Sequence, residues 1–337
     1  MSHHQTGKNG SILRIVFTAL VLSQPALAEC KENAASTPLR LSPRDVSLLG
    51  KGSFLNFQIP ELEPVVEYGS FFGLKITLKI QGGWNAFSGG DIKKGIDGMY
   101  DNGVAAFSAS GVPIVENDRA SGRGGIEVGG DLIYAVTPRF GIGIGAARAS
   151  AWKESHLLFQ QGPLDPGSFQ SRPHVAVSTL RAGMFYSWPF SGLLAISVRG
   201  GPAFYSAEYT SVLGCNIGFL KDGLIYTSYF QKAGAKQLGF EGGLGLEFTP
   251  NPFVAIFFEV QGRYAKINDV EGDEEAVFFQ DNQSQESASS GPVYIVDTAP
   301  NVQLDIIPPD EAVPGNARKA TLDFSGFTYL AGLKFRL

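Results

Sequence analysis

Residues 238–264 read LGFEGGLGLEF-TPNP-FVAIFFEVQGRY, and the fold prediction starts from this stretch. By itself it fits either a soluble β-sandwich or a membrane-spanning β-barrel, and the rest of the chain separates the two. From Leu238 to Phe248 the large apolar side chains share one parity, and the two glutamates share the other. The second half alternates in the same way, with Glu259 and Arg263 opposite the apolar side chains. A period of two indicates β-strands. The Thr-Pro-Asn-Pro break is typical of a turn, so the stretch predicts a hairpin with one apolar and one charged face.

Composition narrows the classes of protein that fit this hairpin. The chain has 337 residues, a formal net charge of −5, 42 glycines and 18% charged residues. The charged share lies below the roughly 25% that is usual in soluble domains. Because there is no basic excess, nucleic acid is not an expected partner.

The first 28 residues have the pattern of a secretory signal peptide. Lys8 and Arg14 precede a short apolar run, and Ala26-Leu27-Ala28 forms a small-x-small cleavage site. The run is too short to span a bilayer as a helix, so residues 1–28 are predicted to be cleaved on export. Residues 29–67 are polar and rich in proline. They are expected to form either a periplasmic leader or a plug inside a barrel.

Alternating patterns predict eight strands along the rest of the chain. A short helix is expected over 91–100, capped by Asp91. Three of the connections are short, proline-containing turns, and four are long and polar, including 153–173 and 268–319. A small hairpin is expected around Lys221-Asp222-Gly223. The predicted strands lie near residues 72–81, 126–136, 140–152, 175–186, 194–205, 238–248, 254–264 and 327–337.

Charged side chains fall almost entirely on one parity of these strands. Arg148 is the exception, near a strand end from which its side chain can reach an interface. Apolar outward faces, charged inward faces and alternating short and long connections are typical of a membrane-spanning barrel. Residues 68–337 are therefore predicted to form an all-β, eight-stranded antiparallel transmembrane β-barrel, with short periplasmic turns and long extracellular loops. The inward charges are expected at Lys75, Lys79, Glu127, Asp131, Arg181, Arg199, Glu241, Glu247, Glu259, Arg263, Lys334 and Arg336.

The hairpin and the final stretch, FSGFTYLAGLKFRL over 324–337, resemble the small bacterial outer-membrane β-barrel family, the OmpA/OmpX-like barrels. The likeness covers about residues 71–337. It implies a location in the bacterial outer membrane and assembly with periplasmic chaperones and the barrel-assembly machinery. The last strand is similar to the family's C-terminal assembly signal, which usually ends in Phe or Trp where this chain has Leu337.

The interior of an eight-stranded barrel is just wide enough for side chains to fill. The inward charges are therefore expected to pair as structural fill, with no catalytic, cofactor or metal site. The predicted function is non-enzymatic, with extracellular loops that bind surfaces, outer-membrane lipid, lipopolysaccharide or another external ligand. A small or gated pore is the alternative.

A barrel-embedded enzyme that processes lipid or peptide is a second alternative. The histidines available to it are His156 and His174, which flank one loop, with Ser155 or Asp165 as conceivable partners. No spacing requires such a pair. The two cysteines, Cys30 and Cys215, are expected on opposite sides of the membrane and therefore unbonded.

Overall fold

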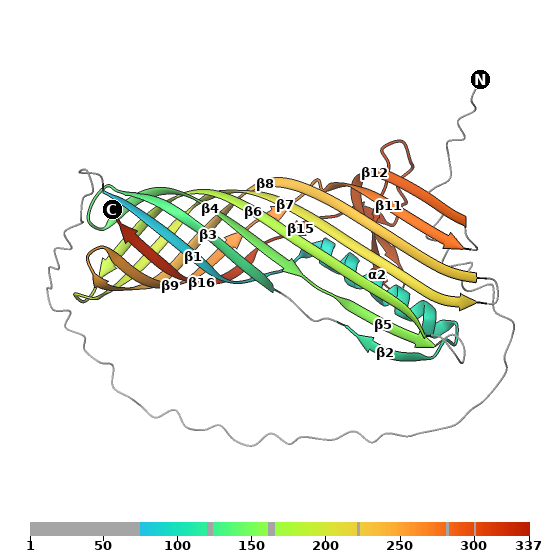
Figure 1. Cartoon of the computed structure of the whole chain (residues 1–337). Helices are drawn as coiled ribbons and strands as arrows, with labels where there is room; N and C mark the ends of the chain where they lie inside the picture. Colours follow the sequence, from blue (N-terminus) through green and yellow to red (C-terminus); the bar gives the residue numbers. More distant parts are fainter. Residues whose placement is uncertain (1–74, 120–123, 161–165, 221–222, 281–282, 300) are drawn as a thin grey trace, which may run out of the picture.

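The computed structural model describes residues 75–119, 124–160, 166–220, 223–280, 283–299 and 301–337. These residues form an all-β architecture of sixteen strands and one helix (Figure 1). The predicted signal peptide and the leader or plug over 29–67 lie outside the described residues, as do Cys30 and Asp165. These expectations, including the unbonded cysteines, remain predictions.

Eight strands pair with one another in a closed order. Each strand is antiparallel to two others, and the last, β16, pairs back onto the first, β1. We refer to the paired parts of these strands as the ring and to its interior as the lumen. The strands are β1 (Ile76–Phe87), β3 (Gly124–Ala135), β4 (Phe140–Trp152), β6 (Pro166–Pro189), β7 (Leu194–Leu220), β8 (Gly223–Asn251), β9 (Val254–Tyr264) and β16 (Gly326–Arg336).

Three short turns lie at one end of the ring, and polar side chains stabilise each of them. The amides of Phe140, Leu194 and Val254 donate to the side chains of Thr137, Ser191 and Asn251 at 3.0, 3.0 and 2.9 Å. The predicted positions of the turns are confirmed. We refer to this end, which also holds the C-terminus, as the turn end (Figure 1).

The predicted long loops are wrong, because their residues form helix α2 and further strands of the sheet. Strands β6, β7 and β8 run well beyond the ring. Residues 221 and 222 of the predicted small hairpin lie outside the described residues, and Leu220 and Gly223 on either side of them pair at the ends of β7 and β8. The sequence 268–319 contains four strands where a loop was expected. The count of eight strands therefore holds for the ring and not for the chain. The remaining strands are β2 (Ile114–Asp118), β5 (Ser155–Gln160), β10 (Lys266–Ile267), β11 (Glu271–Gln280), β12 (Gln283–Thr298), β13 (Asn301–Ile306), β14 (Ala317–Lys319) and β15 (Leu322–Asp323).

The helix α2 spans Gly90–Ala109, twice the predicted length, and Asp91 is not its N-cap. Gly89, with φ 78°, takes the cap position, and Asp91 binds Arg318 instead, at 2.7 Å to its Oδ1. No helix in the described residues is long and apolar enough to cross a membrane. Glycines at 95 and 98 let α2 approach β13, since a Cβ at Gly98 would lie 1.9 Å from the Val302 carbonyl oxygen.

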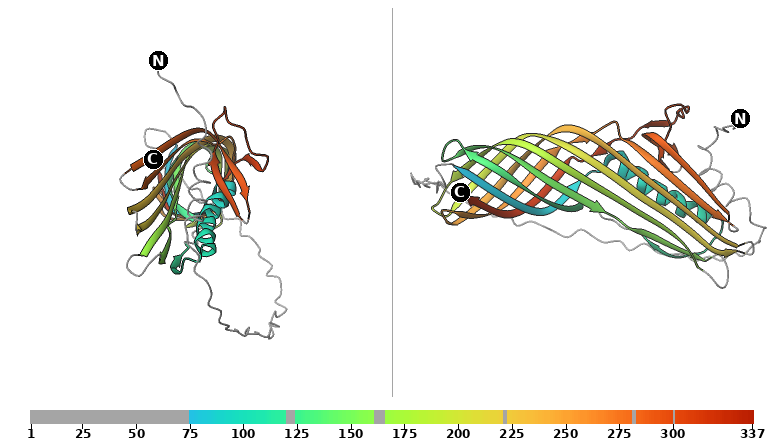
Figure 2. Two further views of the ribbon diagram at one scale, coloured as in Figure 1. Left: turned by 90° about the vertical axis from the view of Figure 1, so that its right-hand side faces the viewer. Right: turned by 45° about the horizontal axis from the view of Figure 1, so that its top comes forward.

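The sheet continues beyond the ring, away from the turn end. Helix α2 lies on the concave side of this part of the sheet (Figure 2). We define the extension as α2, β2, β5, β11 to β14, and β6 to β8 beyond the ring. Its core is apolar, with Ile92, Phe107, Phe159 and Phe169 among its buried residues.

The inward parity of β7 runs unbroken from the ring into the extension, but its chemistry changes. Ser197 and Arg199 face the lumen, whereas Tyr205, Tyr209 and Leu213 face the apolar core further along the same strand. The strands alternate throughout, so one hydrogen-bonded sheet encloses a charged lumen at one end and an ordinary apolar core at the other.

Candidate functional site

The lumen holds the largest cluster of charged side chains in the described residues. The period of two brings the inward residues of all eight strands together, as the parity of the sequence predicts. Of the twelve expected charges, nine are buried; Glu241 and Arg336 are half-buried, and Lys75, before β1, is exposed. The predicted inward network is confirmed within the described ring.

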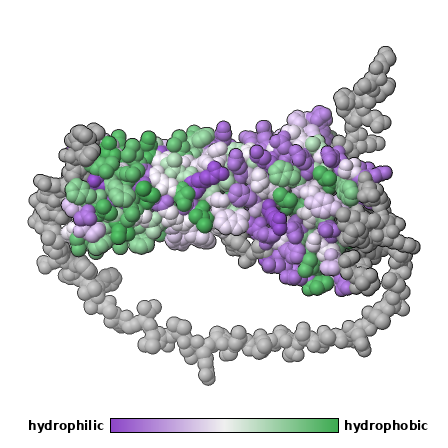
Figure 3. All heavy atoms as spheres, viewed as in Figure 1, coloured by the Kyte–Doolittle hydropathy of each residue, from purple (hydrophilic) through white to green (hydrophobic). Residues whose placement is uncertain are grey.

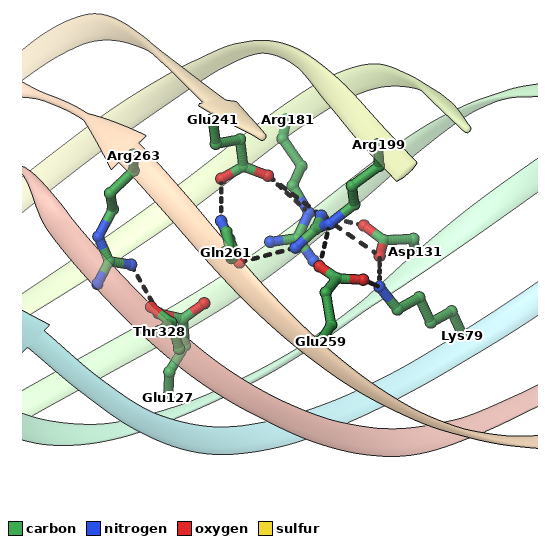
Figure 4. Close-up of polar contacts among 10 residues, drawn as sticks. All are labelled: Lys79, Glu127, Asp131, Arg181, Arg199, Glu241, Glu259, Gln261, Arg263 and Thr328. Carbon is green, nitrogen blue, oxygen red and sulfur yellow. Dashed lines mark hydrogen bonds and ion pairs between the residues drawn. The ribbon is translucent and has the colours of Figure 1, made fainter. Parts of the chain in front are cut away.

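The centre of the network joins six strands, and Glu241 on β8 lies within ion-pair distance of Arg181 and Arg199 (Figure 4). Glu259 on β9 accepts from Lys79 Nζ at 2.6 Å and from Arg199 Nε at 2.5 Å. Arg199 also donates to Gln261 Oε1 at 2.7 Å. Arg181 Nε lies 2.6 Å from Asp131 Oδ1. Each strand supplies side chains that compensate charges on strands beyond its direct neighbours.

Two smaller clusters lie on either side of this centre, one toward the extension and one toward the turn end. Glu127 accepts from Arg263 Nη1 at 2.7 Å and from Asn85 Nδ2 at 3.0 Å. Lys334 pairs with Glu247 nearer the turn end. Ion pairs therefore occupy the lumen along its length.

Two cavities lie between these side chains. A cavity beside Arg181 and Glu241 has about 10 Å³ of free volume, and one near the turn end, beside Lys334 and Arg336, has about 60 Å³. On this measure about 10–15 Å³ is enough for one water molecule, so the first cavity holds at most one water and the second has room for several. The network cross-links the strands of the ring and leaves room for water beside some of its charges.

The outer surface of the ring is the chemical reverse of the lumen. Neighbouring residues on β9 show the contrast: Phe257 is 0% exposed and Glu259 is 5% exposed, whereas Phe258 is 65% exposed. On the face shown in Figure 3, apolar side chains gather on the half of the molecule that carries the short turns, and hydrophilic side chains are more frequent on the extension. We call this apolar surface the belt.

Exposed aromatic side chains border the belt at both margins. Tyr186 and Trp188 lie toward the turn end, and Trp84, Tyr264 and Tyr329 lie toward the extension. The rings of Trp84 and Tyr329 stack with centroids 6.3 Å apart. Aromatic girdles at two levels are typical of barrels that cross a bilayer.

The histidines expected for an enzyme do not assemble with the residues named for them. His174 Nε2 lies 2.8 Å from Ser150 Oγ, and not beside Ser155, which faces Ser171. His156 lies opposite Gln170 on β6. Within the described ranges the structure shows no acid or amide that orients the His174 ring as a catalytic triad requires. Sequence reasoning missed Ser150 because only the pairing of β4 with β6 brings it to His174.

The extension contains a half-buried acid, Glu274, in a segment that the sequence predicted to belong to a long polar connection. The acidic segment 269–275 falls within the long polar connection predicted over 268–319, but it enters β11, where successive side chains point to opposite faces. Glu271, Asp273 and Glu275 are exposed, whereas Glu274 points inward, and burial raises the pKa of its carboxyl to about 7. Gln231 Nε2 donates to this carboxyl at 3.4 Å. The described residues contain no group of three His, Cys, Asp or Glu side chains that could hold a metal ion.

Comparison with known proteins adds a distant likeness. No protein-family model matches the chain, and no curated protein matches it. Among solved structures it is similar to the outer membrane protein OprG from Pseudomonas aeruginosa, at 12% identity and a TM-score of 0.32, covering 78% of this chain and 96% of that one. It is also similar to a major outer membrane protein from Thermus thermophilus, at 12% identity and a TM-score of 0.35, covering 78% of this chain and 99% of that one.

Proposed function

We propose that this chain is a non-enzymatic outer-membrane β-barrel protein whose sealed ring anchors the extension at the bacterial surface. One observation carries the proposal: the ring has buried charged side chains in its lumen and exposed apolar side chains on its outer surface. In water an exposed apolar belt promotes association. In a bilayer the same belt contacts lipid, and the closed ring leaves no unpaired sheet edge in the hydrocarbon.

The height of the belt fits a bilayer. On β8 the exposed apolar side chains run from Leu238 to Phe248. At about 3.4 Å per residue and a tilt of about 40°, this run rises about 26 Å. The outward apolar band of bacterial barrels is about 25 Å tall. The turn end then faces the periplasm and the extension faces outward.

The packed lumen supports an anchoring role over a pore. Ion pairs cross the ring at three levels, and the two cavities described beside them are of a size that holds water molecules. Binding is assigned to the extension, whose polar surface stands outside the belt. Membership of the OmpA/OmpX-like barrels, and assembly by periplasmic chaperones and the barrel-assembly machinery, belong to the same proposal.

Lipid contact at neighbouring residues tests the proposal. Phe258→Cys and Glu259→Cys are each introduced into a background without Cys30 and Cys215, labelled with a fluorophore and reconstituted in vesicles. A lipid-soluble quencher is expected to quench the label at 258 and to spare the label at 259. Equal quenching at both positions, or none at either, would contradict a membrane-spanning ring.

Conductance separates the anchor from the pore. Planar bilayers that contain the full chain are expected to remain silent, because the ion pairs fill the lumen. Steady ion conductance would favour a small pore and overturn the sealed anchor, while leaving the membrane location intact.

A further inference from the structure

Four polar residues lie directly opposite one another across four strands, on the outer face of the wall. Arg148 on β4 pairs with Ser178 on β6, Ser178 pairs with Ser206 on β7, and Ser206 pairs with Lys236 on β8. We call this set the polar row. Both cations are exposed. Three strand spacings of about 4.8 Å separate them, so the row spans about 14 Å.

The adjacent outward row, one position closer to the turn end, is entirely apolar. Ala146, Leu180, Phe204 and Leu238 are paired in the same order on the same four strands. Leu180 and Leu238 are more than half exposed. The belt therefore ends at the polar row on these strands, and cationic side chains stand directly above a lipid-facing surface.

The charges of the polar row lack compensation from the protein. In the described part of the chain, the structure gives neither Arg148 nor Lys236 an ion pair or a side-chain hydrogen bond. The nearest outward carboxylate on β7, Glu208, is one outward position further from the belt. A cation beside the hydrocarbon is costly, so an anion supplied by the surroundings would stabilise Arg148 where it stands. Ser150 and His174, beside Arg148 on the same face, add hydrogen-bonding capacity.

We propose that the polar row binds the phosphate groups of an outer-leaflet lipid with two phosphates on its headgroup, as lipid A of lipopolysaccharide has. One phosphate pairs with Arg148, whose planar guanidinium forms bidentate bonds to phosphate oxygens. The other pairs with Lys236, and the two serines donate hydroxyls between them. The acyl chains then lie along the apolar row. This inference rests on the proposed membrane location and names a partner for that surface.

Binding of two defined lipids tests the inference. The full chain in detergent micelles is titrated with diphosphoryl lipid A and with the same lipid after its phosphates are removed, and bound lipid is counted by native mass spectrometry. The wild-type chain is expected to prefer the phosphorylated lipid by about tenfold or more. Arg148→Ala/Lys236→Ala is expected to lose this preference.

Matched variants keep the test specific. Lys232→Ala removes an exposed cation from the same face of β8, two outward positions beyond Lys236, and is expected to keep the preference. Arg148→Lys should keep most of it, whereas Arg148→Gln should lose it. A double variant that retains the wild-type preference would overturn the inference.

The quenching measurement at positions 258 and 259 separates this inference from the proposed function. A label at 258 that is quenched, in a chain without phosphate preference, rejects the polar row as a lipid site and leaves the membrane ring standing. A label at 258 that escapes quenching rejects both.

Discussion

Arg263 on β9 and Glu127 on β3 lie 2.7 Å apart in the lumen, although two other strands, β16 and β1, separate them around the ring. The Arg263 guanidinium also stacks over the side chain of Phe324, with its Cζ 4.0 Å from the centroid of the phenyl group. This pair connects the charged lumen to the edge of the apolar core in the extension.

Breaking this ion pair from one side should destabilise the ring strongly. Glu127→Gln leaves the Arg263 charge buried without its partner, and the free energy of unfolding is expected to fall by about 3–5 kcal/mol. Urea titration in detergent micelles measures the change. Asp269→Asn is the control, because its pair with Lys319, at 3.2 Å, is exposed and should contribute less than about 1 kcal/mol.

Replacing both partners gives a second measure of the same pair. Glu127→Leu/Arg263→Met removes both charges together and should recover much of the stability lost by Glu127→Gln. A double variant as unstable as the single one would show that geometry specific to this pair, and not an uncompensated charge, stabilises the ring.

Depth in the bilayer should decide how costly a new charge is on the belt. Phe258→Arg places a cation on the outer face of β9 and is expected to cost about 2–4 kcal/mol, with reduced insertion into vesicles. Phe253→Arg makes the same change at another exposed phenylalanine, in the turn before β9, and should cost about 1 kcal/mol or less. Similar losses at the two sites would argue against a bilayer around the belt.

The half-buried carboxyl of Glu274 should make the stability of the extension depend on pH. Burial raises its pKa from 4.5 to about 7, so the folded state holds more protons than the unfolded state between these values. The free energy of opening β11 should therefore fall as pH rises through this window, by about 3 kcal/mol in total. Hydrogen exchange of the β8 and β11 amides, corrected for intrinsic rates, measures this change. Glu274→Gln should abolish the slope, whereas Glu275→Gln, exposed on the same strand, should preserve it.

Export should leave a defined end on the mature chain. Signal cleavage after Ala28 predicts an N-terminus at Glu29. Mass spectrometry of protein extracted from membranes measures it directly. A mature chain that still carries residues 1–22 would exclude export by a cleaved signal.

The sequence predicted the ring well and the extension poorly, for a physical reason. In the ring, each strand has charged side chains on its inward face and apolar side chains on its outward face. This alternation can be read from the sequence alone, as at Phe258 and Glu259. In the extension, strands such as β11 carry Glu271, Asp273 and Glu275 on one face and Gly272, Glu274 and Ala276 on the other, and this polar composition resembles a loop. Pairing between segments distant in sequence, such as β8 with β11, decides their structure.

The side-chain contacts at the candidate sites could not be predicted from the sequence for a similar reason. The parity of each strand predicted which charges point inward, but not that Arg263 would meet Glu127, because other strands lie between the partners around the ring. The hydrogen bond between Ser150 and His174 and the alignment of Arg148 with Lys236 likewise depend on register between strands. A single sequence carries no direct signal for register.

Strands β7 and β8 pair without a register shift from Leu194 to Asn216, so they form one continuous two-stranded ribbon that reaches from the ring into the extension. Its 27-residue strand β7 is about 90 Å long at 3.3 Å per residue. At a tilt of about 40°, with about 25 Å spent in the bilayer, its tip would stand about 40 Å above the membrane surface. Because the two strands stay paired from the belt into the extension, a ligand bound at the far end of the extension would be held at a fixed height and orientation. A force applied to that end would be transmitted along the paired strands to the ring.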